Sequence, residues 1–361
     1  RGRPGGRRPA PRRASGSGRC LASTLRYPDV VAAHNAPPPA GPALALLATL
    51  AGCGGAAEGP PPRPSVLLVV ADSLHARHLG AWGHGRDTSP RVDALAREGL
   101  RFEQAYSQSS WTLPSVASLL TSLEQERHGM RTLEGTLPDE PDTLAGLFAR
   151  AGWRTHAVVQ TPVLGSARGL RRGFEGYRVL PFGNQASDEA VERTVGAFEA
   201  ADGAPLFAYL HLAPPHMPYQ PPDAWRGRFS AGLGGDPAVD GSIASCRGAH
   251  ELRLAPDHPD VLRLAALYDE HVAYADACVG RLLDGLQGLP SAQDLLVVLT
   301  SDHGEAFLQH GAQGHNAQVY EEMLHVPLVV AGRGRVTVAP GVVEEPVSLL
   351  DLLPTLVDLL D

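Results

Sequence analysis

Residues of the kinds that bind metal ions follow two apolar runs of this sequence. Asp72 ends the run Val-Val-Ala-Asp, and Asp302 and His303 follow the run Leu-Leu-Val-Val-Leu-Thr at 295–300. An adjacent carboxylate and imidazole offer the mixed oxygen and nitrogen donors that suit zinc, manganese or a similar ion. Taken alone, an aspartate at either position is more typical of a helix or turn cap than of a metal ligand. A cap explains neither His303 nor the repetition of the pattern, so we predict that Asp72, Asp302 and His303 bind a metal ion.

A threonine precedes the proline that opens an apolar helix, in the stretch Trp111-Thr-Leu-Pro114. Thr112 at this spacing is typical of an N-cap, with the proline in the first helical turn. A helix start presents N–H groups and a partial positive charge, which favour a bound anion. A hydroxyl there, beside a metal ion, would be acidified and could attack phosphorus or sulfur. We therefore predict that Thr112 is both a nucleophile and a metal ligand.

Further histidines lie in segments that follow predicted strands. His216 lies in a loop rich in proline, which restricts its backbone, and His310 and His315 follow Asp302 by a few residues. One such histidine alone is more often a structural residue. Three histidine-bearing segments near strand ends together favour a functional site.

The apolar runs predict buried strands that alternate with helices. Continuous runs of β-branched and apolar residues are typical of strands covered on both faces. Strands are expected at 66–71, 155–159, 206–212, 295–300 and 326–330, and helices at 89–98, 114–123, 142–151, 187–200 and 261–286. Their alternation predicts an α/β fold with a doubly wound, mostly parallel sheet sandwiched by helices, and a site beyond the carboxyl ends of the strands. Residues 228–258 are predicted to form an inserted surface loop.

Composition limits the possible partners and chemistry. The chain has 361 residues, 43% of them hydrophobic, which is enough for a large core. It has no lysine, so all 31 basic residues are arginine, and chemistry that needs a lysine ammonium group is excluded. Eight of these arginines but only one acidic residue, Asp29, lie within residues 1–52, so the remainder is strongly acidic. We therefore do not expect nucleic-acid binding.

The N-terminal region resembles a bacterial lipoprotein leader. Residues 41–52 form an apolar run too short to span a bilayer, and Leu-Ala-Gly-Cys at its end resembles a lipobox in which Cys53 is lipidated. The alternative is a buried helix. We assign 1–64 to a disordered leader, lipoprotein signal and tether, and 65–361 to a catalytic domain. This predicts a secreted, periplasmic or cell-envelope protein whose membrane contact is a lipid anchor.

The four cysteines have neither zinc-ribbon spacing nor the spacing of a disulfide framework. Cys246 and Cys278 are expected to be two thiols, with a disulfide between them as the alternative in an oxidising compartment.

From Pro64 to Asp361 the chain resembles the sulfatase N-terminal domain of the alkaline-phosphatase superfamily. The matching stretches occur in family order: PSVLLVVADSL, TSPRVDALAREGLRFEQAYSQSSWTLPSVASLLTSL, RHGM, HLAPPHMPYQPP, YDEHVAYADACVGRLLDGL, LTSDHGEAFLQHG, YEEMLHVPLVVAG and LLDLLPTLVDLL. The resemblance implies an α/β sandwich, a metal site and a covalent intermediate. It also implies a small C-terminal subdomain, which this sequence is expected to lack in part.

Residues of this chain fall on the functional positions of the family. The resemblance places Thr112 on the nucleophile and implies metal ligands at Asp72, Asp302 and His303. It also implies that three histidines contact the ester or protonate the leaving oxygen: His216, His128 and His315.

The chain departs from the formylglycine sulfatases that it resembles. Those enzymes have Cys or Ser-x-Pro-x-Arg, whereas this chain has Thr112-Leu-Pro-Ser-Val116. Oxidation of the secondary β-carbon of threonine would give a ketone rather than an aldehyde. Ser73 also replaces the second residue of the usual Asp-Asp pair, and the lysines that bind sulfate are absent. The resemblance therefore favours the phosphoryl-transfer branch, with threonine as nucleophile.

The sequence as a whole predicts a metal-dependent hydrolase or transferase of sulfate or phosphate esters, with phosphodiester-type chemistry favoured. The expected cofactor is a divalent zinc, manganese or calcium ion, and the expected partner is a small-molecule, glycan or lipid ester. Two alternatives stay open. One is a sulfuric ester hydrolase that acts without formylglycine, and the other is a catalytically degenerate surface binding protein.

Overall fold

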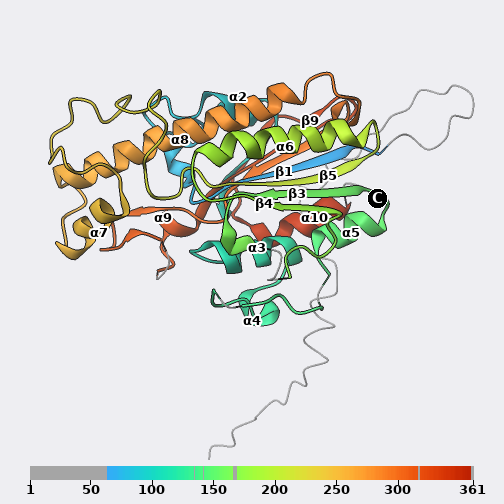
Figure 1. The fold of residues 1–361 in the computed structure, drawn as a ribbon, viewed down its shortest axis with the longest axis horizontal. Helices are drawn as coiled ribbons and strands as arrows, with labels where there is room; N and C mark the ends of the chain where they lie inside the picture. Colours follow the sequence, from blue (N-terminus) through green and yellow to red (C-terminus); the bar gives the residue numbers. More distant parts are fainter. Residues whose placement is uncertain (1–62, 134, 141, 166–168, 316–317, 359–361) are drawn as a thin grey trace, which may run out of the picture. The chain divides into compact units, whose positions relative to one another are not determined.

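The centre of the molecule is one nine-stranded β-sheet (Figure 1). The computed structural model describes residues 63–133, 135–140, 142–165, 169–315 and 318–358, so the predicted lipobox at Cys53 lies outside the described residues. In spatial order the strands are β10 (Gly341–Val343), β2 (Leu100–Tyr106), β9 (His325–Arg333), β6 (Leu295–Thr300), β1 (Ser65–Ala71), β5 (Leu206–Leu212), β3 (Arg154–Val159) and β4 (Gly176–Val179). β11 (Val347–Ser348) also pairs with β2. Pairing is parallel except along β9, which runs antiparallel to β2 and β6.

β1 lies between β5 and β6, and every residue of these three strands is buried. Such burial is expected for parallel strands that are covered on both faces. The register places Val70 opposite both His211 and Thr300. The three strands therefore end at the same level, and their carboxyl ends lie at one edge of the sheet.

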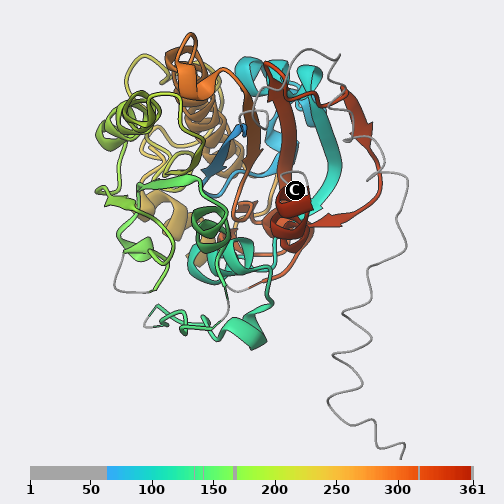
Figure 2. The ribbon, with the colours of Figure 1, turned by 90° about the vertical axis from the view of Figure 1, so that its right-hand side faces the viewer.

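Helices cover both faces of the sheet (Figures 1 and 2). One face carries α2 (Pro90–Glu98), α6 (Gln185–Ala201) and α8 (Pro259–Gly285), and the other carries α3 (Thr112–Thr121), α5 (Leu144–Arg150) and α10 (Leu352–Asp358). Within β1, Leu67 and Val69 pack into the core on the α8 side, and Val66, Leu68 and Val70 pack into the core on the α3 side. The alternation of a strand thus decides which helices a residue meets. All ten residues of α3 are buried, so this helix is enclosed rather than amphipathic.

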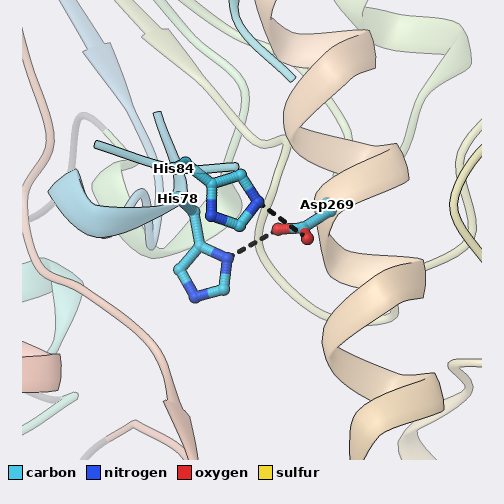
Figure 3. Close-up of side chains that lie close together, drawn as sticks. All are labelled: His78, His84 and Asp269. Carbon is cyan, nitrogen blue, oxygen red and sulfur yellow. Dashed lines mark hydrogen bonds and ion pairs between the residues drawn. The ribbon is translucent and has the colours of Figure 1, made fainter. Parts of the chain in front are cut away.

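The chain beyond β1 packs against α8. It forms two short 3₁₀ turns, η2 (Ala76–His78) and η3 (Gly80–Trp82). The hydroxyl of Tyr268 donates to the carbonyl of Ser73 at 2.6 Å. The neighbouring Asp269 contacts His78 and His84 (Figure 3). These contacts hold the chain that follows Asp72 against the long helix.

The remaining elements are short: α4 (Gln125–His128), α7 (Ile243–Glu251), α9 (Glu321–Leu324), η4 (Pro162–Leu164), η6 (Pro290–Ala292), η7 (Leu349–Asp351), β7 (Ala306–Phe307) and β8 (Gln313–Gly314). α7 lies within 228–258, so the prediction of a loop is wrong for that part. Ser242 caps α7 by accepting the N–H of Ser245, and the helix buries Cys246 and Ala249. The cap and the two buried side chains stabilise a helix whose sequence shows little periodicity.

The predicted fold class is confirmed, and all ten predicted strands and helices are present, with ends shifted by at most three residues. β2, β4, β10 and β11 were not predicted, because they are short or only half-buried and lack a continuous apolar run. Cys246 and Cys278 are buried free thiols, and burial raises their pKa values to about 12 and about 11. Within the described residues, we find no helix with the length and hydropathy needed to cross a membrane.

Candidate active site

Two carboxylates and an imidazole meet where the three central strands end. Asp72 directly follows β1, His211 is the last residue but one of β5, and Asp302 lies two residues beyond β6. Side chains alternate between the two faces of a strand. By this alternation, Asp72, His211 and Asp302 lie on the same face as the strand residues that pack into the core on the α3 side. One ligand atom from each of the three lies within 4.8 Å of the others. The sheet therefore directs these groups toward the helix that carries Thr112.

A chain of hydrogen bonds from β5 holds the carboxylate of Asp72. The hydroxyl of Tyr209 lies 2.9 Å from Nδ1 of His211, and Nε2 of His211 lies 3.3 Å from Oδ2 of Asp72. With the proton on Nε2, the imidazole donates to Asp72 and accepts from Tyr209. The hydroxyl of Ser73 donates to the other oxygen, Oδ1, at 3.1 Å.

The charges of the site favour an anionic Asp72. Burial alone would raise its pKa, but the imidazoles of His216, His211 and His303 outweigh burial and hold the pKa of this carboxyl below its usual value. Burial lowers the pKa of His211, but its hydrogen bond to Asp72 and the charge of Asp302 raise it above the ordinary value. Asp72 is thus in the charge state that a metal ligand requires.

Asp302 and His303 form an arrangement that fits a cation. Nδ1 of His303 lies 2.9 Å from the carbonyl of Gly304, so the N–H at Nδ1 donates to that carbonyl and Nε2 is the ring nitrogen directed at the site. This nitrogen faces Oδ1 of Asp72 and Oδ2 of Asp302, each at 3.5 Å. Oδ2 of Asp302 is buried and has no hydrogen-bond donor among the described residues. Acceptors that face one another in a buried site are unfavourable without a cation between them, so the donor set fits a divalent metal ion.

Thr112 lies at the start of α3 and faces this group. Its Oγ1 is 3.4 Å from Nε2 of His303. The predicted N-cap role is wrong, because Trp111 occupies the N-cap position with extended backbone and Thr112 is the first helical residue. The hydroxyl of Thr112 is therefore not used as a cap. The N-cap residue Trp111 makes no side-chain hydrogen bond to the first turn of α3, and the N–H groups of such a turn favour an anion.

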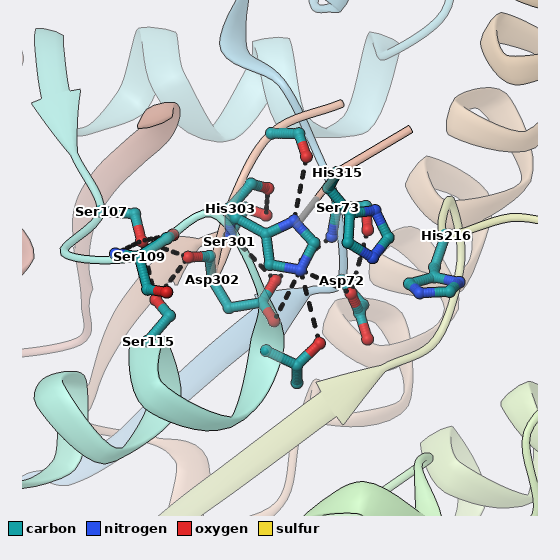
Figure 4. A network of polar contacts seen from close by, with 12 residues as sticks. Asp72, Ser73, Ser107, Ser109, Ser115, His216, Ser301, Asp302, His303 and His315 are labelled. Atoms are coloured by element: carbon teal, nitrogen blue, oxygen red, sulfur yellow. Dashed lines mark hydrogen bonds and ion pairs between the residues drawn. The ribbon is translucent and has the colours of Figure 1, made fainter. Parts of the chain in front are cut away.

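Serine hydroxyls hold α3 against the end of β6 (Figure 4). Ser107 and Ser115 both donate to the backbone carbonyl of Asp302 and contact each other at 2.7 Å. The backbone N–H groups of Ser73 and His303 donate to Oδ1 of Asp302 at 3.2 and 3.0 Å. Asp302 is thus fixed at its carbonyl and at one carboxylate oxygen, which leaves Oδ2 for the site.

Two further predicted residues extend this group: His315 lies beside His303, and His216 lies beside His315 (Figure 4). The ring centroid of His315 is 4.3 Å from that of His303 and 4.7 Å from that of His216. Nδ1 of His315 lies 3.2 Å from the buried carboxylate of Glu305, and Nδ1 of His216 lies 2.6 Å from the carbonyl of Met217. In both rings the N–H at Nδ1 has an acceptor in the protein, so Nε2 is the atom that could serve a substrate.

His128 has different neighbours. Its Nε2 lies 3.0 Å from Oγ of Ser118 on α3, and its Nδ1 accepts the N–H of Met130 at 3.1 Å. Burial lowers its pKa below the ordinary value. In the described part of the chain, no hydrogen bond or ring contact joins it to His303 or Thr112. This geometry favours a structural role, and the catalytic role of His128 stays a prediction.

Two residues of the site were not assigned from the sequence. His211 is the last residue but one of an apolar strand, β5. Its position near the end of a predicted strand was the one sequence feature that could have marked it as a site residue. Glu305 follows His303 closely in sequence, but only the folded chain shows that its carboxylate is fully buried against His315.

Comparisons with known proteins show what this chain is similar to. Residues 64–361 match the family model described as Sulfatase. The ulvan-active sulfatase of Formosa agariphila is 25% identical over 83% of this chain and 62% of its own length. Human arylsulfatase A is 27% identical over 81% of this chain and 63% of its own length. This chain therefore spans less than two-thirds of the length of these curated relatives.

A solved structure has the same architecture. The phosphonate monoester hydrolase of Agrobacterium radiobacter superposes with a TM-score of 0.64 at 25% identity, over 82% of this chain and 74% of that one. The sulfatase family model spans every described strand and helix, from β1 to α10. The chain belongs to the sulfatase family.

Proposed function

We propose that this protein hydrolyses or transfers sulfate or phosphate esters through a covalent intermediate on Thr112, with phosphodiester-type chemistry favoured. One observation carries the proposal: Oγ1 of Thr112 lies 3.4 Å from Nε2 of His303, which itself faces the carboxylates of Asp72 and Asp302. A hydroxyl next to carboxylates and an imidazole is the set of groups that metal-assisted nucleophilic displacement requires.

Asp72, Asp302 and His303 would hold the metal ion, with Thr112 as a further ligand and His211 either binding directly or orienting Asp72. When bound, a divalent ion would stabilise the deprotonated hydroxyl of Thr112 and the negative charge that develops on the ester. The nitrogen donors favour zinc or manganese over calcium, which prefers oxygen ligands.

Thr112 would attack phosphorus or sulfur, and the bond to the leaving oxygen would break. The N–H groups in the first turn of α3 would bind a non-bridging oxygen of the ester. Nε2 of His216 would supply a proton to the leaving oxygen, and His315, held by Glu305, is the second candidate for this role. Water or an acceptor alcohol would then attack the ester on Thr112, and the hydroxyl would regain its proton.

The residues of α3 support a threonine hydroxyl that acts directly. Val116 stands where formylglycine sulfatases have arginine, and it is fully buried in the apolar core. The similarity to a phosphonate monoester hydrolase supports an ester of phosphorus. The curated relatives that are named sulfatases support a sulfate ester as the alternative substrate.

The test compares variants at the two ends of α3. We expect Thr112→Ala to lower kcat/KM for an aryl phosphodiester by about three to six orders of magnitude, because the nucleophile is lost. Thr112→Ser should retain measurable turnover. Thr121→Ala is the matched control, since Thr121 is also buried on α3 but bonds to the carbonyl of Ala117. Wild-type turnover in Thr112→Ala would exclude the mechanism.

Two alternatives are tested by the same protein. A higher kcat/KM for an aryl sulfate than for an aryl phosphodiester or phosphonate monoester would favour a sulfuric ester hydrolase that acts without formylglycine. A folded chain that binds no metal and turns over none of these esters would favour a surface binding protein. The burial of the four predicted metal-site residues in one group argues against the binding protein.

The cellular location is a separate proposal, which rests on the lipobox at Cys53. Mass spectrometry of the chain purified from bacterial membranes should show a lipid on Cys53. Cys53→Ala should lack it and appear in the soluble fraction.

A further inference from the structure

A second group of metal-binding side chains lies outside the candidate active site, where the chain beyond β1 meets α8 (Figure 3). One ligand atom from each of His78, His84 and Asp269 lies within 4.8 Å of the others. Nδ1 of His78 lies 2.6 Å from Oδ1 of Asp269, and Nε2 of His84 lies 3.0 Å from Oδ2. The two rings are 5.2 Å apart between centroids. Both histidines therefore direct a nitrogen at the same carboxylate.

The local backbone brings the two histidines together. They are six residues apart, a spacing that on a continuous α-helix would separate them by about 120° around the axis. Here His78 ends η2 and His84 follows η3, and Gly83 adopts a left-handed φ of 89° that turns the chain back. The N–H of His84 donates to the carbonyl of Leu79 at 3.1 Å and closes this turn. Asp269 then meets both rings from α8.

This ligand set and its exposure suit an exchangeable ion. Two imidazoles and one carboxylate leave a coordination position open, as in many zinc sites. The side chains of His78 and His84 are 16% and 18% exposed, so an ion could reach them from solvent, whereas Asp269 is buried at 1%.

Arg86 is the competitor for Asp269. Its Nη1 lies 2.5 Å from Oδ2 of Asp269. The side chain of Arg86 is 35% exposed, and its guanidinium also lies 6.0 Å from the centroid of the Phe229 ring. The guanidinium therefore has water and an aromatic face available if it leaves the carboxylate.

We propose that His78, His84 and Asp269 form a second site for a divalent transition-metal ion of the zinc class, and that Arg86 and the ion exclude each other at Asp269. On binding, the proton that each ring directs at Asp269 moves to the other ring nitrogen, so that a lone pair faces the ion. The bound ion would fix residues 76–84 to α8. This site is distinct from the ester chemistry proposed above.

The test uses the full chain in an Asp72→Asn, Asp302→Asn background, which removes ligands of the first site. The chelator-treated protein is titrated with Co²⁺, followed by the visible absorption of the bound ion, and then with Zn²⁺. We expect one equivalent of Co²⁺ that Zn²⁺ displaces. His84→Gln should weaken binding at least about tenfold. His250→Gln, at an exposed histidine on α7, is the matched control and should change nothing.

Arg86→Ala gives the most discriminating result, because it keeps all three ligands. We expect it to strengthen Co²⁺ binding several-fold, since the competing cation is removed. Circular dichroism and thermal unfolding check that each variant folds. Absence of bound Co²⁺ in the background chain, unchanged binding in His84→Gln, or unchanged or weaker binding in Arg86→Ala would each overturn the proposal. The three side chains would then form only a hydrogen-bonded clamp.

Discussion

The two groups of histidine and aspartate in this molecule differ in what faces their carboxylates. In the candidate active site, Oδ2 of Asp302 is buried without a hydrogen-bond donor among the described residues, and Nε2 of His303 lies 3.5 Å away. In the second group, both oxygens of Asp269 accept hydrogen bonds, from His78, His84 and Arg86. A buried acceptor without a donor costs about 1–3 kcal/mol. The first group is thus organised for a cation in advance, whereas the second must release a guanidinium to bind one.

The two groups also differ in the secondary structure that carries their side chains. Asp72, His211 and Asp302 stand at the ends of adjoining buried strands, and hydrogen bonds fix them on several sides. His78 and His84 stand on short 3₁₀ turns with partly exposed rings. The strand ends hold carboxylate acceptors close to one another, whereas the 3₁₀ turns bring donors to the oxygens of Asp269. The same types of side chain can therefore either leave a carboxylate oxygen open to a metal ion or satisfy it with hydrogen bonds from the protein.

Among variants of the two groups, Asp302→Asn should have the largest effect on ester turnover. A small effect would contradict the contrast between the two groups. We expect ester turnover to fall by about three orders of magnitude or more, because a proposed metal ligand is lost. In the metal-free chain the free energy of unfolding should change little or rise, since a buried carboxylate oxygen without a donor is removed. Assays of kcat/KM and urea denaturation with a chelator measure the two effects. A large loss of stability without metal would contradict the interpretation.

His211→Asn tests the support of Asp72. Metal affinity or turnover should fall about 10- to 100-fold, because Asp72 loses the imidazole that holds it or a ligand is lost. Tyr209→Phe is the graded control, since it removes only the hydroxyl at the far end of the same chain of hydrogen bonds. Isothermal titration with Zn²⁺ and kcat/KM would measure both variants. Equal effects of the two would argue against this order of contacts.

Asp269→Asn tests the satisfied carboxylate. In the metal-free chain we expect a loss of about 1–3 kcal/mol in the free energy of unfolding, because three donors lose their charged acceptor. The partial exposure of those donors moves the expectation to the lower end of this range. Ester turnover should stay within a few-fold of wild type. Urea denaturation with unchanged stability would show that the contacts contribute nothing.

Asp276 extends the comparison to a carboxylate that backbone donors satisfy. It accepts the N–H groups of Arg91 and Val92 at the start of α2. Burial nevertheless raises its pKa to about 6. The folded chain then keeps a proton that the unfolded chain releases between about pH 4 and 6, so the free energy of unfolding should fall as the pH rises through this window and become level above it.

Asp276→Asn should reduce that slope, by at most about 1.4 kcal/mol per pH unit. Urea denaturation of the two proteins at pH 4.5, 5.5 and 7 measures the difference. Parallel pH profiles of variant and wild type would contradict the assignment.

Much of the fold could be predicted because its signals are local. The run Val66–Ala71 is apolar throughout, which identifies a strand covered on both faces before any partner is known. β2 escaped prediction because six of its seven residues are only partly buried, and its pairing with β9 and the edge strands stabilises it. α7 escaped for a similar reason, since a cap and two buried side chains define it rather than a periodic sequence.

The site was predicted less evenly. Asp72, Thr112 and the pair at 302–303 carry distinctive residue types at the ends of recognisable elements, and the fold does bring them together. His128 was assigned only through the family resemblance of the stretch RHGM, and in the fold it bonds to Ser118 and Met130. The type of a residue does not show which way its side chain points in the fold. The sequence therefore could not show that His303 faces the site whereas His128 bonds to Ser118.

The amino-acid sequence by itself determined which chemical groups are available: a threonine hydroxyl at 112, acids and histidines after apolar strands, and no lysine. These are properties of single residues and short runs. The tertiary structure alone decided which groups meet, because the order and register of β5, β1 and β6 join Asp72 to residues more than a hundred positions away. It also decided that both oxygens of Asp269 meet donors, whereas Oδ2 of Asp302 has none among the described residues. That difference depends on where the backbone places hydrogen-bond partners across the fold, which no local pattern of residues specifies.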